Sequence, residues 1–220
     1  MTPSVIPTDE RAKLTARAAL ASIAMAVILI VLKSWAAWRT DSTAMLGSLA
    51  DSGLDLVASL VVLLGVRIAA QPADLDHRFG HGKAEALAAL VQVILISLSA
   101  VFIGVRAVQR LLSGAQTADA ELGIGVSLAA MILTAALISY QRHVVRRTGS
   151  LAIGTDRLHY ASDLLLNGSV IVALALDQFV RLTGADAMFG VLIALWLLWG
   201  AWRASSHALD QLMDKEWPDE

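Results

Sequence analysis

Long apolar runs separated by short polar connections make up nearly the whole chain. A membrane-spanning helix needs about 20 mostly apolar residues. Six segments qualify, at 14–38, 43–69, 84–112, 121–142, 150–177 and 186–212. Polar connections are expected at 39–42, 71–83, 113–119, 142–149 and 177–185. The pattern predicts an all-α polytopic membrane protein with six transmembrane helices, an N-terminal segment 1–13, a transmembrane domain 14–212 and a C-terminal stub 213–220.

Composition supports a membrane protein. Hydrophobic residues make up 57% of the 220 residues, whereas soluble domains usually contain about 45–50%. The net charge of −2 gives no indication of nucleic-acid binding. Cysteine is absent, which excludes disulfides, thiolate metal sites and cysteine nucleophiles. The first apolar run is too long for the core of a signal peptide, so we interpret it as a retained first span.

The distribution of Lys and Arg predicts the orientation, because cytoplasmic loops carry an excess of these residues. With six spans, both termini and the loops 71–83 and 142–149 share one side of the membrane. That side and its span ends hold twelve of the 17 basic residues, and the other side holds five: Lys33, Arg39, Arg106, Arg110 and Arg181. We therefore expect both termini to be cytoplasmic.

Two matched pairs of ionisable residues interrupt apolar spans. Asp51 and Asp55 lie in the second predicted span, and His159 and Asp163 lie in the fifth. Each pair has i, i+4 spacing, which places both side chains on one face of a helix. Such residues are costly in a bilayer and normally face a bundle interior, where they carry function. If the two faces meet, three carboxylates and one imidazole can converge on one divalent transition metal such as zinc.

A structural interpretation of these residues competes with the metal site. A lone intramembrane Asp can pair with an Arg or cap a broken helix. Four convergent groups with no basic partner at the same depth favour the metal site instead. Asp156 and Asn167 extend the polar face of the fifth span, and we expect them to support the site or line a cavity. Since metal ligands must be deprotonated, metal and protons would compete for the same groups.

The connection 71–83 reads QPADLDHRFGHGK and holds a second set of potential ligands. Asp74, Asp76, His77 and His81 are four potential ligands within eight residues, and nearby glycines allow a compact turn. The alternative is an ordinary solvated loop. A metal site here would be of low affinity, structural, or an entry funnel.

Three motifs carry a resemblance to the cation diffusion facilitator family, in particular its bacterial YiiP-type zinc/iron efflux antiporters. They are DSGLD in the second span, QPADLDHRFGHGKAEALAAL leading into the third, and HYASD in the fifth. The resemblance covers nearly the whole chain. It implies a six-helix bundle in the bacterial inner membrane that acts as a homodimer by alternating access and exchanges cytoplasmic divalent metal for outside protons.

The resemblance also implies roles for individual residues. It carries the transport site onto Asp51, Asp55, His159 and Asp163, and a secondary loop site onto Asp74, His77 and His81. A Lys matching Lys83 joins a charge interlock between protomers in the family, and we expect Asp214 to be its partner. One His with three Asp resembles the zinc- and cadmium-selective pattern. Relatives with Asn or a fourth Asp there tend toward manganese or iron.

One departure concerns the C-terminus. Most relatives continue with a dimerising cytoplasmic domain of metallochaperone-like α/β fold, whereas this sequence ends at KEWPDE. Both a shortened chain and a naturally short family member fit this pattern.

We predict a secondary active transporter rather than an enzyme, with zinc as substrate, protons as counter-ion and the lipid bilayer as its surroundings. Cadmium, ferrous iron, cobalt and manganese remain open as substrates. An intramembrane hydrolase is the first alternative, but the sequence contains neither HExxH nor GxGD. A metal-binding membrane scaffold without transport is the second. It predicts zinc binding without flux.

Overall fold

The computed structural model describes residues 7–40, 43–113, 121–180 and 185–214. This part of the chain contains six α-helices and no strand: α1 (Thr8–Thr40), α2 (Thr43–Ala69), α3 (Lys83–Ser113), α4 (Glu121–Thr148), α5 (Leu151–Val180) and α6 (Ala185–Leu212). The all-α class and the number of helices are as the sequence predicts. Five of the helices are long and apolar enough to cross a membrane. The exception, α5, carries Asp156, Arg157, His159 and Asp163 in its first half.

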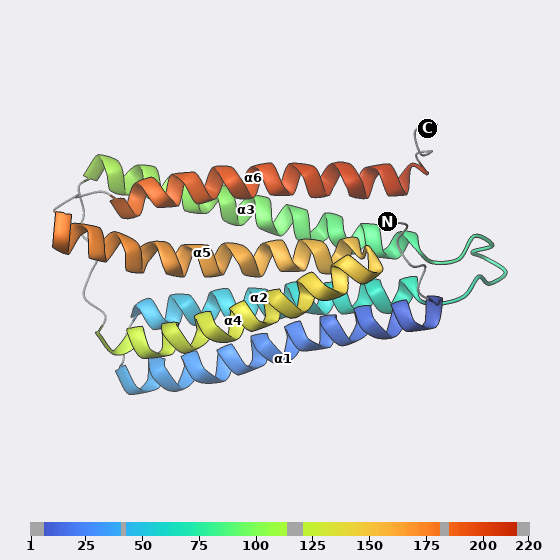
Figure 1. Cartoon of the computed structure of the whole chain (residues 1–220), viewed down its shortest axis with the longest axis horizontal. Coiled ribbons are helices and arrows are strands. Elements are labelled where there is room, and N and C mark those ends of the chain that lie inside the picture. Colours follow the sequence, from blue (N-terminus) through green and yellow to red (C-terminus); the bar gives the residue numbers. More distant parts are fainter. Residues whose placement is uncertain (1–6, 41–42, 114–120, 181–184, 215–220) are drawn as a thin grey trace.

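Helix α5 runs through the middle of the bundle (Figure 1). Helices α3 and α6 pack extensively against each other on one side of α5, and α1, α2 and α4 lie on the other. Helix α5 contacts all five of the other helices. Polar side chains on α5 are therefore surrounded by protein, which accounts for a spanning helix that is less apolar than its neighbours.

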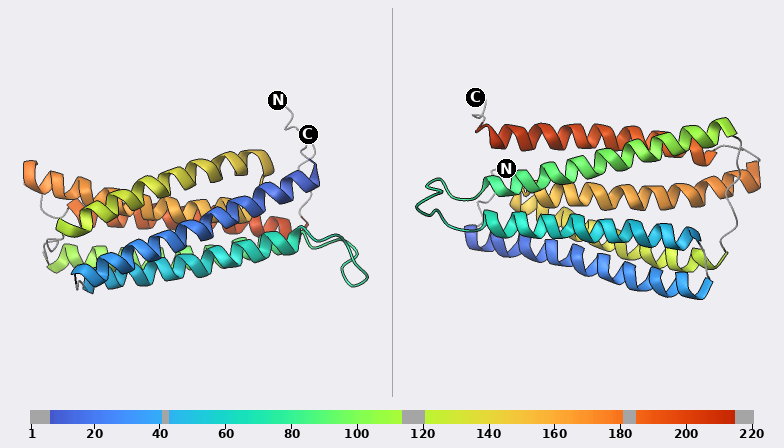
Figure 2. Two further views of the ribbon diagram at one scale, coloured as in Figure 1. Left: turned by 90° about the horizontal axis from the view of Figure 1, so that it is seen from below. Right: turned by 180° about the vertical axis from the view of Figure 1, so that it is seen from behind.

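The first residues of α1, the last residues of α6 and the loop between α2 and α3 lie at the same end of the bundle (Figure 2). The connection between α4 and α5 also lies there. This arrangement agrees with the even number of spans. The excess of Lys and Arg at this end predicts that it is the cytoplasmic end.

The connection between α4 and α5 differs from the prediction. The stretch 142–149 was expected to be a loop, but α4 continues to Thr148. Basic residues are favourable in the last turn of a helix, so Arg146 and Arg147 extend α4 rather than end it. Gly149 ends it with a positive φ of 65°. Ser150 then caps α5, since its Oγ accepts from the backbone N–H of Ile153 at 3.2 Å.

Helices α1 and α5 also extend beyond their predicted ranges. Helix α1 begins at Thr8 rather than at residue 14, because acidic Asp9 and Glu10 stabilise its first turn. Helix α5 extends to Val180, into the stretch 177–185 that was expected to be a connection. Both differences have one cause. Hydropathy marks the part of a helix inside the membrane, and a helix can continue into water.

Small residues bring α2 and α3 close together. A Cβ atom on Gly65 of α2 would clash with the Cβ of Ala88 on α3, so a glycine is needed for this close approach. Large apolar side chains such as Leu54, Leu64, Leu98 and Leu192 are instead exposed on the outer surface. A surface of this kind is suited to lipid, as expected for a bundle without water around its middle.

Candidate metal site

The buried cluster consists of Asp55, His159 and Asp163. Asp55 lies on α2, and the other two lie one turn apart on α5. One ligand atom from each of the three lies within 4.8 Å of the others. Asp55 and His159 are each 8% exposed. The two polar helix faces predicted from the sequence therefore meet inside the bundle.

A direct hydrogen bond joins the two helices at this cluster. The imidazole Nε2 of His159 lies 2.8 Å from Oδ1 of Asp55. The other ring nitrogen, Nδ1, is buried and has no hydrogen-bond partner within the described residues. A divalent ion bound between these groups would take the place of the hydrogen bond, because the imidazole nitrogen that coordinates a metal cannot also carry a proton.

The spacing of the cluster is close to that of a metal site. Tetrahedral ligands about 2.1 Å from zinc lie roughly 3.4 Å from one another. The ligand atoms here lie within 4.8 Å of one another, and Nε2 of His159 lies 2.8 Å from Oδ1 of Asp55, so the separations are of the size that an ion site requires.

Asp51, the fourth predicted ligand, does not join the cluster. It lies one turn before Asp55 on α2 and is exposed. Its carboxylate is nevertheless close enough to interact electrostatically with Asp55 and with the cations Lys33 and Arg106. The structure thus gathers three of the four predicted ligands, and Asp51 lies at the edge of the cluster.

The sequence-based expectation of no basic partner at this depth is wrong. Lys33 of α1 was assigned to the outer side of the membrane, but its Nζ donates to Oγ of Ser52 at 2.7 Å. Ser52 is fully buried and lies between Asp51 and Asp55 in the sequence. A long Lys side chain can reach several ångströms from its Cα, which residue position alone does not reveal.

Asp156 forms a polar hub one turn before His159 on α5. It is completely buried. Its carboxylate accepts from Ser22 of α1 at 2.6 Å, from Gln92 of α3 at 3.2 Å and from Gln141 of α4 at 2.7 Å. These three donors satisfy a carboxylate that would otherwise be costly to bury. Asp156 therefore fixes three helices against α5, as a supporting residue of the site.

Tyr160 adds a second connection next to His159. Its hydroxyl donates to the backbone carbonyl of Ser22 at 3.1 Å and lies 3.2 Å from Oγ of Ser59 on α2. Its ring meets the His159 ring edge-on, with centroids 5.8 Å apart. Asn167, also expected near the site, is exposed farther along α5.

Sequence reasoning missed Ser22, Gln92, Gln141 and Tyr160. Each interrupts an apolar helix, and that was the available signal. It was weaker than the signal from paired charged residues, because single neutral polar residues are common in membrane helices.

The loop cluster consists of Asp74, His77 and His81, which also bring one ligand atom each within 4.8 Å of one another. Nδ1 of His77 lies 3.2 Å from Oδ1 of Asp74, and Nε2 of His81 lies 3.5 Å from its Oδ2. The predicted loop ligands are thus brought together. Asp76 does not join them, and its backbone N–H donates to Oδ1 of Asp74 at 3.0 Å.

The exposed carboxylate of Asp74 accepts the backbone hydrogen bonds that hold the turn of this loop. The backbone N–H of His77 donates to its Oδ1 at 2.6 Å. This backbone hydrogen bond, aided by the side chain of His77, lowers the pKa of the Asp74 carboxyl below its ordinary value. The carboxylate therefore stays ionised, and available as a ligand, in mildly acidic solution.

Lys83 connects the start of α3 to the end of α6. Its Nζ donates to Oδ2 of Asp214 at 2.8 Å and to the carbonyl of Leu212 at 3.0 Å. The partner expected from the sequence is therefore in contact with Lys83, here within one chain. The pair is exposed, so its contribution to stability is small.

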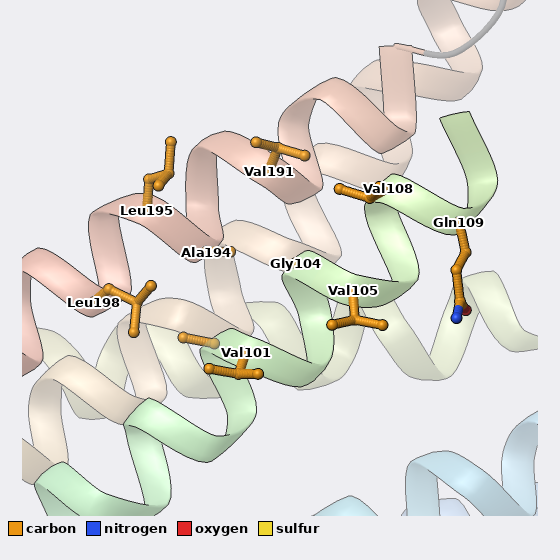
Figure 3. Close-up of a pocket in the computed structure, with 10 residues that line it drawn as sticks. Val101, Gly104, Val105, Val108, Gln109, Val191, Ala194, Leu195 and Leu198 are labelled. Atoms are coloured by element: carbon orange, nitrogen blue, oxygen red, sulfur yellow. The ribbon is translucent and has the colours of Figure 1, made fainter. Parts of the chain in front are cut away.

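An apolar groove of about 390 Å³ lies between α3 and α6 (Figure 3). Val101, Val105, Val191 and Leu195 are among its lining residues, and Gln109 is the polar one. The groove contains no titratable side chain. It is therefore no candidate for an ion site.

Comparison with known proteins shows similarity to cation-efflux proteins over most of the chain. Residues 19–213 match the model of the cation efflux transmembrane domain. The chain is 44% identical over 208 residues to the cation-efflux pump FieF of Cronobacter sakazakii, covering 94% of this chain and 69% of that protein. It is 46% identical over 209 residues to FieF of Pectobacterium atrosepticum, covering 95% and 69%. FieF of Escherichia coli K12 is 45% identical over 208 residues, covering 94% and 69%.

Proposed function

The chain belongs to the cation efflux family, and we propose that it exchanges a divalent metal, with zinc as its main substrate, for protons. It is a multi-pass protein of the bacterial inner membrane that exports cations. The ion would bind at Asp55, His159 and Asp163, with Asp51 completing the set. Alternating access of the helix bundle would expose this site to each side in turn. The protein is then a secondary active transporter.

The observation that supports this proposal best is the hydrogen bond between α2 and α5 inside the bundle. His159 and Asp55 lie 104 positions apart in the sequence, yet their side chains meet at 2.8 Å inside the helix bundle. Asp163 completes a set of one nitrogen and two oxygen ligands. An ion-binding role explains why ionisable side chains are retained at this depth.

The chemistry of the ligands favours zinc. Imidazole suits borderline transition metals, whereas magnesium and calcium prefer oxygen ligands alone. Three carboxylates with one imidazole also suit cadmium, ferrous iron, cobalt and manganese to different degrees. Zinc accepts this set in a tetrahedral arrangement, which two ligands from each of two helices can provide.

Proton exchange follows from the same ligands. The site binds metal only when its imidazole nitrogen and carboxylates are deprotonated. A metal leaving on one side is therefore replaced most easily by protons, which neutralise carboxylates that have lost their counter-ion. Protonation of the empty site would allow the bundle to return to its first state.

The exposed loop cluster has a different role in this proposal. Asp74, His77 and His81 would bind metal weakly at the cytoplasmic end and raise its local concentration near the bundle. We further propose a homodimer in which the Lys83–Asp214 pair at the same end helps to hold α3 and α6 of each protomer in place. These exposed groups would tune transport rather than carry it.

The experiment that tests the proposed function is zinc uptake into proteoliposomes with an acidic lumen, followed with a zinc dye and a pH dye together. Wild-type protein is expected to admit zinc and to make the lumen less acidic at the same time. Asp51→Ala is expected to lose both signals. Zinc entry with no proton movement would contradict the antiport, and zinc binding without any entry would identify a scaffold.

A further inference from the structure

Lys33 occupies an unusual place for a basic residue. It lies in the apolar stretch ILIVLKSWAAW, seven residues before the end of α1 at Thr40. The outer end of the helix is therefore about 10 Å away at 1.5 Å per residue. A Lys in such a place usually extends toward the membrane surface. Here the ammonium group instead donates to buried Ser52 at 2.7 Å.

Two of the proposed ligand carboxylates lie within the electrostatic reach of Lys33. Its charge acts on Asp51 and also on Asp163. Asp51, Asp55 and Asp163 together bring up to three negative charges into the bundle. Arg106 of α3 acts on Asp51 as well, from an exposed position. Lys33 is thus a fixed positive charge held at the edge of the ligand set by a hydrogen bond to α2.

We propose that Lys33 is a tethered counter-cation of the transport site, competing with the metal ion for the same carboxylates; this inference rests on the transport function proposed above. When the metal is bound, the ammonium raises the free energy of the dication by repulsion. When the metal has left, the ammonium partly neutralises the carboxylates. Lys33 therefore weakens metal binding and stabilises the empty site, and both effects speed release.

This role concerns charge rather than packing, and the two can be separated. A packing role would depend on the length and shape of the side chain, and on the contact with Ser52. A counter-cation role depends on the positive charge, which Arg retains and Met removes. Arg39, in the last turn of the same helix, provides a matched control because its guanidinium stacks over Trp35 at 5.9 Å.

The test compares wild type with Lys33→Met, Lys33→Arg and Arg39→Met in two assays. Zinc binding is measured by isothermal titration calorimetry on detergent-purified protein, and initial zinc uptake is measured in proteoliposomes over a range of zinc concentrations. Lys33→Met is expected to bind zinc about tenfold more tightly, with a lower KM and a lower maximal rate. Lys33→Arg and Arg39→Met are expected to stay within about threefold of wild type.

Three results would overturn the inference: unchanged zinc affinity in Lys33→Met, weaker affinity in Lys33→Met, or equal changes in Lys33→Met and Lys33→Arg. Should Lys33→Met fail to fold, Lys33→Gln replaces it, since Gln retains a donor for Ser52 without the charge. Failure of the proposed function has a separate signature, because wild type itself would then bind or transport no zinc.

Discussion

Asp55 and Asp163 of the buried cluster come from two helices that are far apart in the sequence, and His159 meets Asp55 across 104 positions. The loop cluster of Asp74, His77 and His81 lies within eight residues. Both clusters bring ligand atoms within 4.8 Å. Ligand atoms are thus brought together in two ways, by the packing of a whole bundle and by one local turn.

The difference has consequences for what each cluster can do. The buried cluster moves apart or together when α2 and α5 move, so ion binding there can be coupled to a change in the bundle. The loop cluster is fixed by its own turn, and its Asp74 and His77 are exposed to water, where charges interact weakly. We therefore expect the first cluster to determine whether transport occurs and the second to affect only its rate or affinity.

The largest difference should come from the same substitution made in both clusters. Removing a residue that hydrogen-bonds to a metal ligand typically lowers metal affinity or activity about 10–100-fold. Removing a ligand itself should therefore lower it at least ~100-fold. Asp163→Asn is expected to lower zinc uptake by at least ~100-fold, and Asp74→Asn by less than ~5-fold. Uptake by proteoliposomes measures both. Equal losses would mean that the two clusters have the same role.

Next in size is the effect of Asp156, which supports only the buried cluster. In Asp156→Ala, the donors on Gln92 and Gln141 lose their carboxylate, and each buried group left unsatisfied costs about 1–3 kcal/mol. We expect a clear fall in the thermal unfolding temperature, measured by fluorescence in detergent. Asn167→Ala, an exposed position on the same helix, is the control. An unchanged unfolding temperature in Asp156→Ala would contradict the stabilising role of Asp156.

The identity of the buried imidazole should set metal selectivity. His159→Asp replaces nitrogen with a harder oxygen ligand. The ratio of zinc to manganese uptake is expected to fall about tenfold, equivalent to ~1.4 kcal/mol of discrimination. His81→Asp in the loop is the matched variant and should leave the ratio unchanged. A ratio that changes with His81 but not with His159 would assign selectivity to the loop.

The smallest effect concerns pH and the loop turn. The pKa of Asp74 is lowered in the folded loop by the backbone hydrogen bond from His77. Its stabilising contribution is therefore present above the ordinary Asp pKa, about 3.9, and is lost as the pH falls through the lowered value. Amide hydrogen exchange at His77 should stay slow at pH 5 in wild type and become faster in Asp74→Asn. Equal exchange in both proteins would contradict this.

The sequence predicted the helices and the loop cluster well, for a physical reason. Hydropathy reports which residues lie in the membrane, and the ligands of the loop cluster are local in sequence. Hydropathy did not predict the end of a helix that continues into water, as α4 does through Arg146 and Arg147. Charged residues do not end a helix, whereas Gly149, with its positive φ, does. Helix ends depend on backbone conformation rather than on polarity.

The buried site was predicted only in part. The i, i+4 spacing correctly placed Asp55, His159 and Asp163 on facing surfaces, because that spacing fixes the face of a helix. It did not reveal that Asp51 lies at the edge or that Lys33 turns inward to Ser52. Those features depend on helix rotation and on the reach of a long side chain, which are set by packing between helices.

The most direct test of the account asks where the transported ion binds. Zinc-loaded protein with the loop ligands removed, His77→Ala with His81→Ala, is examined by zinc K-edge X-ray absorption. The account predicts bound zinc with one imidazole and oxygen ligands at about 2.0–2.2 Å, and loss of the imidazole signal when His159→Ala is added. No bound zinc in the loop variant, or an imidazole signal that survives His159→Ala, would contradict it.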